Sequence, residues 1–595
     1  SDGYADKNNL HYALNDWAVS LFSTEDPYKT PLNLYLIGEV HEDGSFRLND
    51  NETLCATELD RFLDEAKESL NGKDLPVTIV LEGAKSESWI ETISGRAHSH
   101  FPGFKKYFSF CSTNAILWLK NYKRMRLIMS VEKTNHCENI EEVYDCLEEL
   151  TGRRIHLSSP EELEELEKEI LCYTNRLATL LLEQKVQESI DSPEQVAWEK
   201  GVVQNWPGRM KSEGFETVKV QTRTGETMNL RTRYYRRSCD RRKGKRYKGV
   251  YAGLVLLGIH DRCTPGLSEM VSSWSALLSS FEEVRQVLYD HGITMDVKVI
   301  RKLTYSFAER ARAIQQAGQI PLSEEDTLHG RRVVISTDGG RTRLREKKRG
   351  PKTSKGRTRY HGNWREPKLL IIYVVDADGK QEKSFSPFID GGFNGPDGLF
   401  SLLKGYLEAL DVNQADQVLF VADGAHWIWN RVPILVRELG LDPKQVYELL
   451  DFYHAVEHLG KVAGLRKKWS SKERKSWIAK QRGRLLKGDA AAVVKDVQAI
   501  CRGRNSKAIK TERDYFVRNQ HRLDFSTVKA LNLPIGSGAI ESSVRRVINL
   551  RLKGPCTFWY KENAAKMIML RSYYKSGRWN LLKIMANSHS SLLAA

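Results

Sequence analysis

The feature that most constrains the fold is a series of short apolar runs in the middle of the chain, some of which end on an acidic residue. The first three runs have no helical pattern between them, and the later runs alternate with amphipathic helical patterns. This order predicts an α/β fold with a mixed sheet (β-β-β-α-β-α-β-α), in which three antiparallel strands precede strands reached through helices. The expected strands cover residues 333–336, 369–375, 383–389, 417–422 and 445–450, and the expected helices cover 399–410 and 428–439.

Three acidic residues occupy informative places in this pattern. Asp338 follows the first run and Asp423 follows the fourth. These strands are neighbours in the expected sheet, so both carboxylates should emerge at one edge. Glu541 lies at the start of a helical pattern, directly after a glycine-rich turn at 536–538. Because the stretch between Asp423 and Glu541 is too long for one connection, we expect a helical insertion within it.

A site of three carboxylates, without His or Cys, offers only hard oxygen ligands. Such ligands suit Mg²⁺ or Mn²⁺, so we expect the three acids to be both catalytic residues and metal ligands. Two ions about 3.5–4 Å apart would activate an attacking oxygen and stabilise the leaving oxygen of a phosphodiester. Zinc is not expected, because the nine cysteines include no CxxC pair, and Cys239 and Cys263 have no partners at ligand spacing.

Charge is divided unevenly along the chain. The net charge is +16, yet residues 1–200 hold 37 acidic and 21 basic side chains, and the rest of the chain holds 39 acidic and 71 basic ones. A basic body of this size indicates a polyanionic partner such as nucleic acid; a basic surface that only faces solvent is the alternative. No apolar run approaches the ~20 residues of a membrane span. We therefore expect no membrane partner and a cytoplasmic, nucleoid-associated location.

Start, turn and periodicity signals divide the chain into five expected parts. A helix should begin at Ser159-Pro160, a hairpin should turn at Thr224-Gly225, and residues 281–312 have the pattern of a helix-turn-helix with cations on the outside of its second helix. The expected parts are an N-terminal α/β domain at 1–150, a helical and hairpin DNA-binding region at 151–330, the first part of the sheet core at 331–454, the helical insertion at 455–530, and C-terminal core helices with Glu541 at 531–595.

Five short motifs in this order resemble bacterial insertion-sequence transposases of the ISKra type, which are related to Mutator-like elements and have an RNase H-like DDE core. The resemblance covers about residues 160–595 and implies that Asp338, Asp423 and Glu541 are the three DDE acids. It also implies supporting roles for Asp451 and His454, which match an Asp-x-x-His motif. The motifs are Val334–Arg341, Trp364–Glu366, Ala422–Trp429, Asp451–His454 and Gly536–Ser542.

This resemblance implies cleavage and joining of DNA strands at element ends by a dimer or larger homo-oligomer. Residues 331–368 hold 14 basic and three acidic side chains beside Asp338, and residues 231–248 interleave basic side chains with tyrosines. Both compositions suit phosphate contact and base stacking. The expected DNA contacts are Arg236, Arg237, Arg241, Arg242, Arg301, Lys302, Arg341, Arg343, Arg345, Lys347, Lys348, Arg349, Arg545, Arg546, Arg551 and Lys553.

The transposase resemblance leaves residues 1–150 without a role. This segment is similar to the erythromycin esterase and Tiki-like superfamily through Gly38-Glu39-Val40-His41 and Glu82. That similarity implies a hydrolytic or metal site at Glu39, His41 and Glu82, and a domain interface or partner-binding segment is the alternative. For the whole chain, two alternatives to a transposase stay open: a domesticated DNA-binding protein that does not cleave, and a nuclease or defence protein built on the same core.

Overall fold

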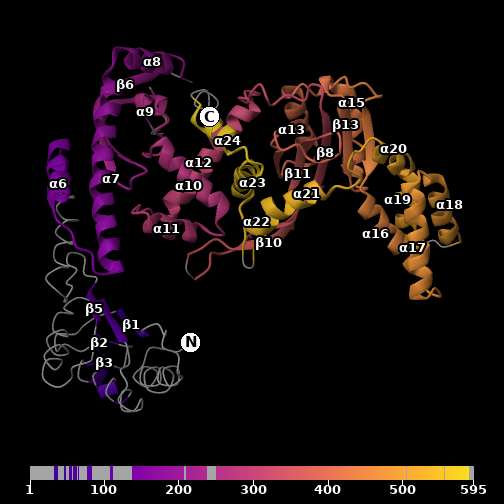
Figure 1. Ribbon diagram of the computed structural model, residues 1–595, viewed down its shortest axis with the longest axis horizontal. Coiled ribbons are helices and arrows are strands. Elements are labelled where there is room, and N and C mark those ends of the chain that lie inside the picture. The colour runs from indigo at the N-terminus through magenta and orange to yellow at the C-terminus, as the bar shows by residue number, and fades with distance from the viewer. Residues whose placement is uncertain are drawn as a thin grey trace. The chain divides into compact units, whose positions relative to one another are not determined.

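The computed structural model describes residues 137–206, 209–237, 249–354, 356–503, 506–554 and 557–588, with short strands and single residues between 32 and 110 (Figure 1). The chain divides into two compact units, 1–136 and 137–595. The boundary lies after His136 rather than after residue 150, because α6 (Ile140–Gly152) packs on α7 (Pro160–Asp191). Arg153, just beyond α6, forms an ion pair of 2.7 Å with Glu169 of α7.

The described parts of the first unit are short strands. Three of them form a parallel sheet in the order β1-β4-β5, and two pair as an antiparallel ribbon. Glu39, His41 and the side chain of Glu82 lie outside the described residues, so the site predicted there stays a prediction. The strands are β1 (Leu32–Ile37), β2 (Phe46–Arg47), β3 (Thr53–Leu54), β4 (Val77–Glu82) and β5 (Tyr107–Phe110).

After α6, the second unit continues with the long helix and the hairpin that the sequence predicts. Ser159 caps α7 by accepting a hydrogen bond from the backbone N–H of Glu162. After α8 (Pro193–Gln204), strands β6 (Met210–Gln221) and β7 (Thr227–Arg237) pair in antiparallel fashion around Gly225. Gly225 has φ +94°, and a Cβ there would lie 2.4 Å from the Gly292 carbonyl oxygen, so glycine is required at this turn.

The helix-turn-helix pattern is present as a helix pair, but its second helix is mostly buried. Within the series α9 (Ala252–Leu256), α10 (Pro265–Leu277), α11 (Phe281–Asp290) and α12 (Val297–Gln316), α12 packs against α10, α23 and α24. Arg310 donates to the Ala586 carbonyl and Arg312 pairs with buried Asp390, so these cations face inward and not outward as expected. Arg301 and Lys302 near the start of α12 are exposed, as are Glu309 and Gln316 further along it.

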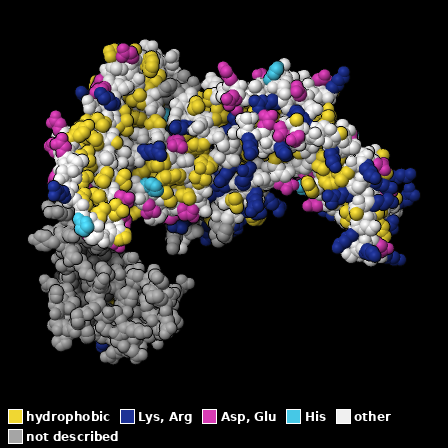
Figure 2. Space-filling view, in the orientation of Figure 1, with side chains coloured by type: hydrophobic (Ala, Val, Ile, Leu, Met, Phe, Trp, Pro, Cys, Tyr) yellow, Lys and Arg dark blue, Asp and Glu magenta, His cyan; other side chains and the backbone are white. Residues whose placement is uncertain are grey.

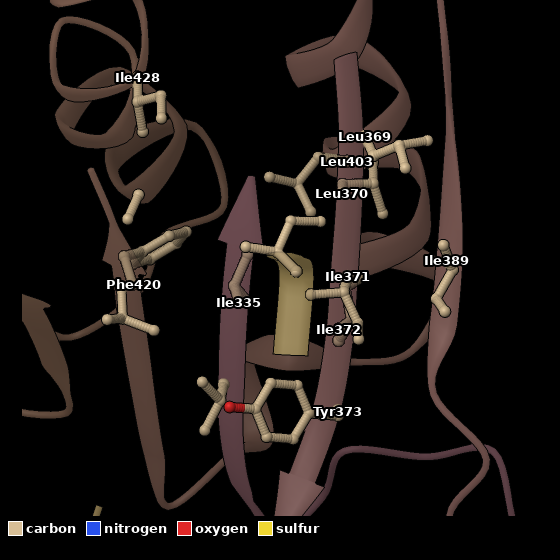
Figure 3. Close-up of a cluster of buried hydrophobic side chains, with 14 of the residues drawn as sticks. Ile335, Leu369, Leu370, Ile371, Ile372, Tyr373, Ile389, Leu403, Phe420 and Ile428 are labelled. Carbon is tan, nitrogen blue, oxygen red and sulfur yellow. The ribbon is translucent and has the colours of Figure 1, made fainter. Parts of the chain in front are cut away.

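A five-stranded mixed sheet forms the centre of the second unit. Its order is β12-β11-β8-β13-β14; β8 and β12 flank β11 in antiparallel fashion, and β13 lies parallel between β8 and β14. Figure 3 shows side chains of β8, β11 and β13, among them Ile335, Ile371 and Phe420, meeting in the core. The strands are β8 (Arg332–Gly339), β11 (Lys368–Val375), β12 (Phe388–Gly392), β13 (Gln417–Ala422) and β14 (Val446–Leu450).

The third strand of this sheet is shifted from its predicted position. The prediction placed it at 383–389, whereas β12 covers Phe388–Gly392. Before it, the chain turns at Gly379, with φ +78°, and Gln381 forms only an isolated bridge with Val375. Pro387 has no N–H to donate to a ladder, so regular pairing begins only after it.

A second hairpin, which the sequence analysis missed, leaves the sheet directly after Asp338. Strands β9 (Thr342–Lys347) and β10 (Tyr360–Arg365) pair in antiparallel fashion, and every residue of β10 is exposed. The sequence of β9 alternates the cations Arg343, Arg345 and Lys347 with other side chains, and β10 shows no alternation of apolar with polar residues. On β9 the buried face consists of Thr342 and Leu344, and β10 has no buried residue, so the usual period-2 hydrophobic signal is weak.

Helices cover the sheet and continue beyond β14. The expected helical insertion is present as α16–α20, and α13, α21 and α23 contact strands of the sheet. No helix among the described residues is long and apolar enough to cross a membrane. The helices are α13 (Gly395–Ala409), η3 (Val412–Gln414), α14 (His426–Trp429), α15 (Val432–Glu438), α16 (Phe452–Gly464), α17 (Ser471–Leu486), α18 (Ala490–Cys501), α19 (Lys507–Arg518), η4 (Gln520–Arg522), α20 (Phe525–Ala530), α21 (Gly538–Ser543), the π-helical η5 (Val544–Asn549), α22 (Leu550–Leu552), α23 (Lys561–Lys575) and α24 (Trp579–Asn587).

Candidate active site at the carboxyl ends of β8 and β13

Asp338 and Asp423 occupy corresponding places on two neighbouring parallel strands. Asp338 is the penultimate residue of β8, and its Oδ1 accepts a hydrogen bond of 2.6 Å from the Gly339 N–H. Asp423 directly follows β13, and its Oδ1 accepts a hydrogen bond of 3.0 Å from the Ala425 N–H. Both aspartates therefore emerge at the carboxyl-terminal edge, as the sequence predicts.

Asp451 connects three segments of this edge. Its backbone N–H bonds to Ala422 at the end of β13, and its side chain caps α16 by accepting a 2.7 Å hydrogen bond from the His454 N–H. The other carboxylate oxygen accepts hydrogen bonds from both the N–H and the hydroxyl of Ser537. Burial alone would raise the pKa of Asp451, but the hydrogen bonds from His454 and Ser537 outweigh it and lower this pKa to about 2.

Glu541 joins the site because Asp451 fixes the turn that precedes its helix. Ser537 is held by Asp451, and α21 begins at the next residue, so Glu541 falls in the first turn of α21. His454 lies between the two acids, with Nδ1 3.3 Å from Asp451 Oδ1 and 3.8 Å from Glu541 Oε1. The Asp451 carboxylate raises the pKa of His454 to about 9, and the charges of Asp423 and Glu541 act in the same direction.

The three acids interact electrostatically. Burial raises the pKa of Asp338 to about 6; the Gly339 N–H and His454 oppose this shift, whereas the charges of Asp423 and Glu541 add to it. When burial and two like charges raise the pKa of an acid, a cation bound beside that acid stabilises its ionised form. This electrostatic situation suits a divalent ion.

The tightest group of potential metal ligands among the described residues is a different triad. Ligand atoms of Asp451, His454 and Glu541 lie within 4.8 Å of one another, whereas the three predicted acids do not form such a group. In this triad both Asp451 oxygens already accept hydrogen bonds, from the His454 N–H and from Ser537. The acids with available oxygens are Asp338, Asp423 and Glu541, and Asp451 and His454 position them.

The side chains predicted to contact DNA differ widely in solvent exposure. Arg551 is only 6% exposed and lies over the rings of Phe281 and Trp559, so it faces the protein interior and not a ligand. Arg343 donates to the Gly554 carbonyl and lies over Phe558. Arg345 and Arg546 are half-buried, and Arg237, Arg241 and Arg242 have no described side chains. The exposed ones are Arg236, Arg301, Lys302, Arg341, Lys347, Lys348, Arg349, Arg545 and Lys553.

Figure 2 shows where basic side chains gather on one face of the second unit. Lys and Arg are dense around β10 and α22 and over α17–α19. On β10, Tyr360 and Trp364 are 43% and 51% exposed, so aromatic rings stand among the cations of this hairpin. An exposed surface of cations and rings is suited to a flexible polyanion with stacking bases.

One face of α19 lines a pocket beside Asp423 and was not predicted from the sequence. Lys507, Lys510, Asp514 and Arg518 recur at helical spacing on one side of this helix and line a pocket of about 790 Å³ that reaches Asp423. Arg518 donates to the Gly424 carbonyl and contacts His426 Nε2, so α19 is joined to the turn that carries Asp423. The i, i+3, i+7, i+11 spacing was the available signal, but nothing in the sequence indicated which element this face meets.

Comparison with known proteins adds little to this geometry. No family model matches the chain, and no curated protein matches it. Among solved structures, the chain is similar to one of the Drosophila P element transposase strand transfer complex, at 11% sequence identity and a TM-score of 0.20. That match covers 56% of this chain and 83% of the other chain. A similarity at this level defines neither fold nor activity, so the functional argument depends on the site itself.

Proposed function

We propose that the protein is a DNA transposase of the DDE type, which cleaves and joins phosphodiester bonds at element ends on an RNase H-like core. The observation that carries the proposal is the placement of Asp338 and Asp423 at the carboxyl ends of the neighbouring parallel strands β8 and β13, with Glu541 reaching the same edge beside His454. The three acids come from β8, the turn after β13 and α21, which are far apart in the sequence. The sheet order β12-β11-β8-β13-β14, with acids at the ends of the two neighbouring parallel strands, supports an RNase H-like core.

The donor set fits the metal that this chemistry needs. Asp338, Asp423 and Glu541 would hold Mg²⁺ or Mn²⁺, because these ions prefer carboxylate oxygen. Two ions, when bound, would activate an attacking oxygen and stabilise the charge on the leaving oxygen.

The basic hairpin β9–β10 supports DNA as the substrate. It leaves β8 directly after Asp338, carries exposed Lys347, Lys348 and Arg349, and presents the exposed rings of Tyr360 and Trp364. Cations that neutralise phosphates and rings that stack on bases would hold a DNA strand beside the acids. Because two element ends must be joined together, the proposal includes a homo-oligomer, a dimer or larger.

The proposal predicts DNA nicking that needs both a divalent ion and Asp423. We expect wild-type protein with Mg²⁺ to nick a duplex carrying the DNA that flanks the gene, and Asp423→Ala to lose this activity about 100-fold or more, since the metal contribution is several kcal/mol. Asp416→Ala, an exposed aspartate before β13, is the matched control and should remain active. The assay is denaturing gel electrophoresis of end-labelled DNA.

The same assay separates the alternatives. DNA binding without nicking by the wild type would indicate a domesticated binding protein, and nicking that is never followed by strand joining would indicate a nuclease. Either outcome contradicts the transposase proposal.

A further inference from the structure

A pocket beside the candidate active site is lined by groups that the cleavage chemistry does not use. It has a volume of about 790 Å³ and lies between the turn after β13, with Asp423 and His426, and the face of α19 that carries Lys507 and Lys510. Both lysines are exposed, and neither forms an ion pair with any residue that the structure describes. Their charges are therefore available to a ligand that lies within reach of Asp423.

Tyr515 contributes a polar group to the lining of this pocket. The residue is 6% exposed and lines the pocket, yet its hydroxyl has no hydrogen-bond partner among the described residues. Leaving a buried hydroxyl unpaired is unfavourable, so the group is placed for a partner that comes from outside the chain. The Tyr515 ring is held in place by two neighbours. It stacks on His458 of α16 at 3.7 Å between ring centres, and it packs so closely on Gly424 that a Cβ there would lie 2.2 Å from it.

Among the residues that the structure describes, the acids lining the pocket are Asp423 and Asp514, and Glu512 pairs at 2.6 Å with His458, which also lines it. Asp423 belongs to the candidate metal site, and Asp514 lies beside Arg513, with 2.9 Å between Arg513 Nε and Asp514 Oδ1. Arg518 adds a third cation, although it also donates to the Gly424 carbonyl. The pocket thus contains the Tyr515 hydroxyl as a neutral hydrogen-bond donor, two lysines without ion-pair partners among the described residues, and Arg518, which already donates one hydrogen bond. This set of groups suits a phosphate better than a cation or an apolar ligand.

We propose that this pocket binds a phosphate-bearing nucleotide of the DNA strand next to the scissile bond, with Tyr515 donating a hydrogen bond to the phosphate and Lys507 and Lys510 neutralising it. The inference rests on the proposed function for its choice of DNA, since the pocket opens beside Asp423. It assigns the helical segment a substrate-binding role that is distinct from the metal site.

The test measures DNA binding without cleavage, so it does not depend on the catalytic acids. Wild-type protein and variants are titrated into a fluorescein-labelled duplex carrying the gene-flanking DNA, in EDTA, at several salt concentrations. For the double variant Lys507→Gln/Lys510→Gln we expect at least a 10-fold weaker affinity and a salt-dependence slope smaller by about 1 to 2, because each phosphate contact contributes about 0.9 to that slope. Lys495→Gln, on exposed α18 surface outside the pocket, is the matched control and should bind like the wild type.

Tyr515→Phe provides a second, independent readout. Since its hydroxyl has no partner within the described residues, removing it should leave the melting temperature unchanged or higher, while DNA affinity falls about 3- to 10-fold with the salt slope unchanged. A lower melting temperature with unchanged DNA affinity would overturn the proposal, as would wild-type affinity and slope in the double lysine variant. Loss of binding in these variants, combined with no Mg²⁺-dependent nicking by the wild type, would support the pocket and contradict only the cleavage proposal.

Discussion

We expect Asp338→Asn to abolish Mg²⁺-dependent nicking and, in EDTA, to make the protein more stable than the wild type. The loss of nicking should be about 100-fold or more, because a metal ligand is removed. The gain in stability follows from burial and from the charges of Asp423 and Glu541, which raise the pKa of Asp338 to about 6. Asparagine keeps an oxygen that can accept the hydrogen bond from the Gly339 N–H while it removes the charge.

The pH dependence of this gain has a definite sign. The pKa of Asp338 is higher in the folded protein than its ordinary value near 3.9, so ionisation opposes folding above pH 6 and has no effect below about pH 4. The stabilisation by Asp338→Asn should therefore be fully present at pH 7, about 1–3 kcal/mol at 1.36 kcal/mol per pKa unit, and should vanish near pH 4. Chemical denaturation in EDTA at both pH values measures it. A variant less stable than the wild type at pH 7 would contradict the electrostatics of this site.

The largest expected loss of stability comes from Arg312→Met. Arg312 of α12 forms two hydrogen bonds of 2.9 Å with Asp390 of β12, whose side chain is fully buried. The same carboxylate accepts hydrogen bonds from Gln315 and from Tyr406 of α13, and Tyr406 in turn meets Tyr573 of α23. Removing the arginine leaves a buried charge without its cation, which costs about 3–5 kcal/mol. Urea unfolding followed by circular dichroism measures this loss.

Arg331→Met is the matched control for this change. Arg331 pairs with Glu382 at 3.1 Å, but both side chains are a quarter or more exposed, so the loss should stay below about 1 kcal/mol. Equal losses in the two variants would show that burial of Asp390 does not control the effect. Restoration of stability by Asp390→Leu in the Arg312→Met background would confirm that the unpaired charge is the cause.

Much of the sheet and of its acidic edge could be predicted because the physics there is local. Apolar runs at 333–336 and 417–422 are long enough to require burial, and an acid directly after a buried strand must emerge at an edge of the sheet. Glu541 was identifiable because glycines at 536–538 mark a helix start. The roles of Asp451 and His454 came from the family resemblance, and the hydrogen bonds of Ser537 give a physical reason for them.

Features that depend on tertiary packing could not be predicted in the same way. Helical periodicity does not reveal which cations turn inward: Arg312 was expected outside and is half-buried against Asp390, and Arg551 was expected to contact DNA and is buried. In the β9–β10 hairpin, Leu344 is the buried hydrophobic side chain of β9 and every residue of β10 is exposed, so the hydrophobic signal is weak. The pocket at Tyr515 forms where α19 contacts the turn after β13, and no sequence pattern within either segment predicts that contact.

The most direct test of the central claim, that Asp423 holds a divalent ion for DNA cleavage, is a change of metal preference in Asp423→Cys. A thiolate is a softer ligand than a carboxylate and favours Mn²⁺ over Mg²⁺. We predict that this variant loses nicking about 100-fold in Mg²⁺ and regains at least about 10-fold in Mn²⁺, while Asp423→Ala stays inactive in both. Wild-type nicking by Asp423→Cys in Mg²⁺, or equal recovery of Asp423→Ala in Mn²⁺, would contradict the claim.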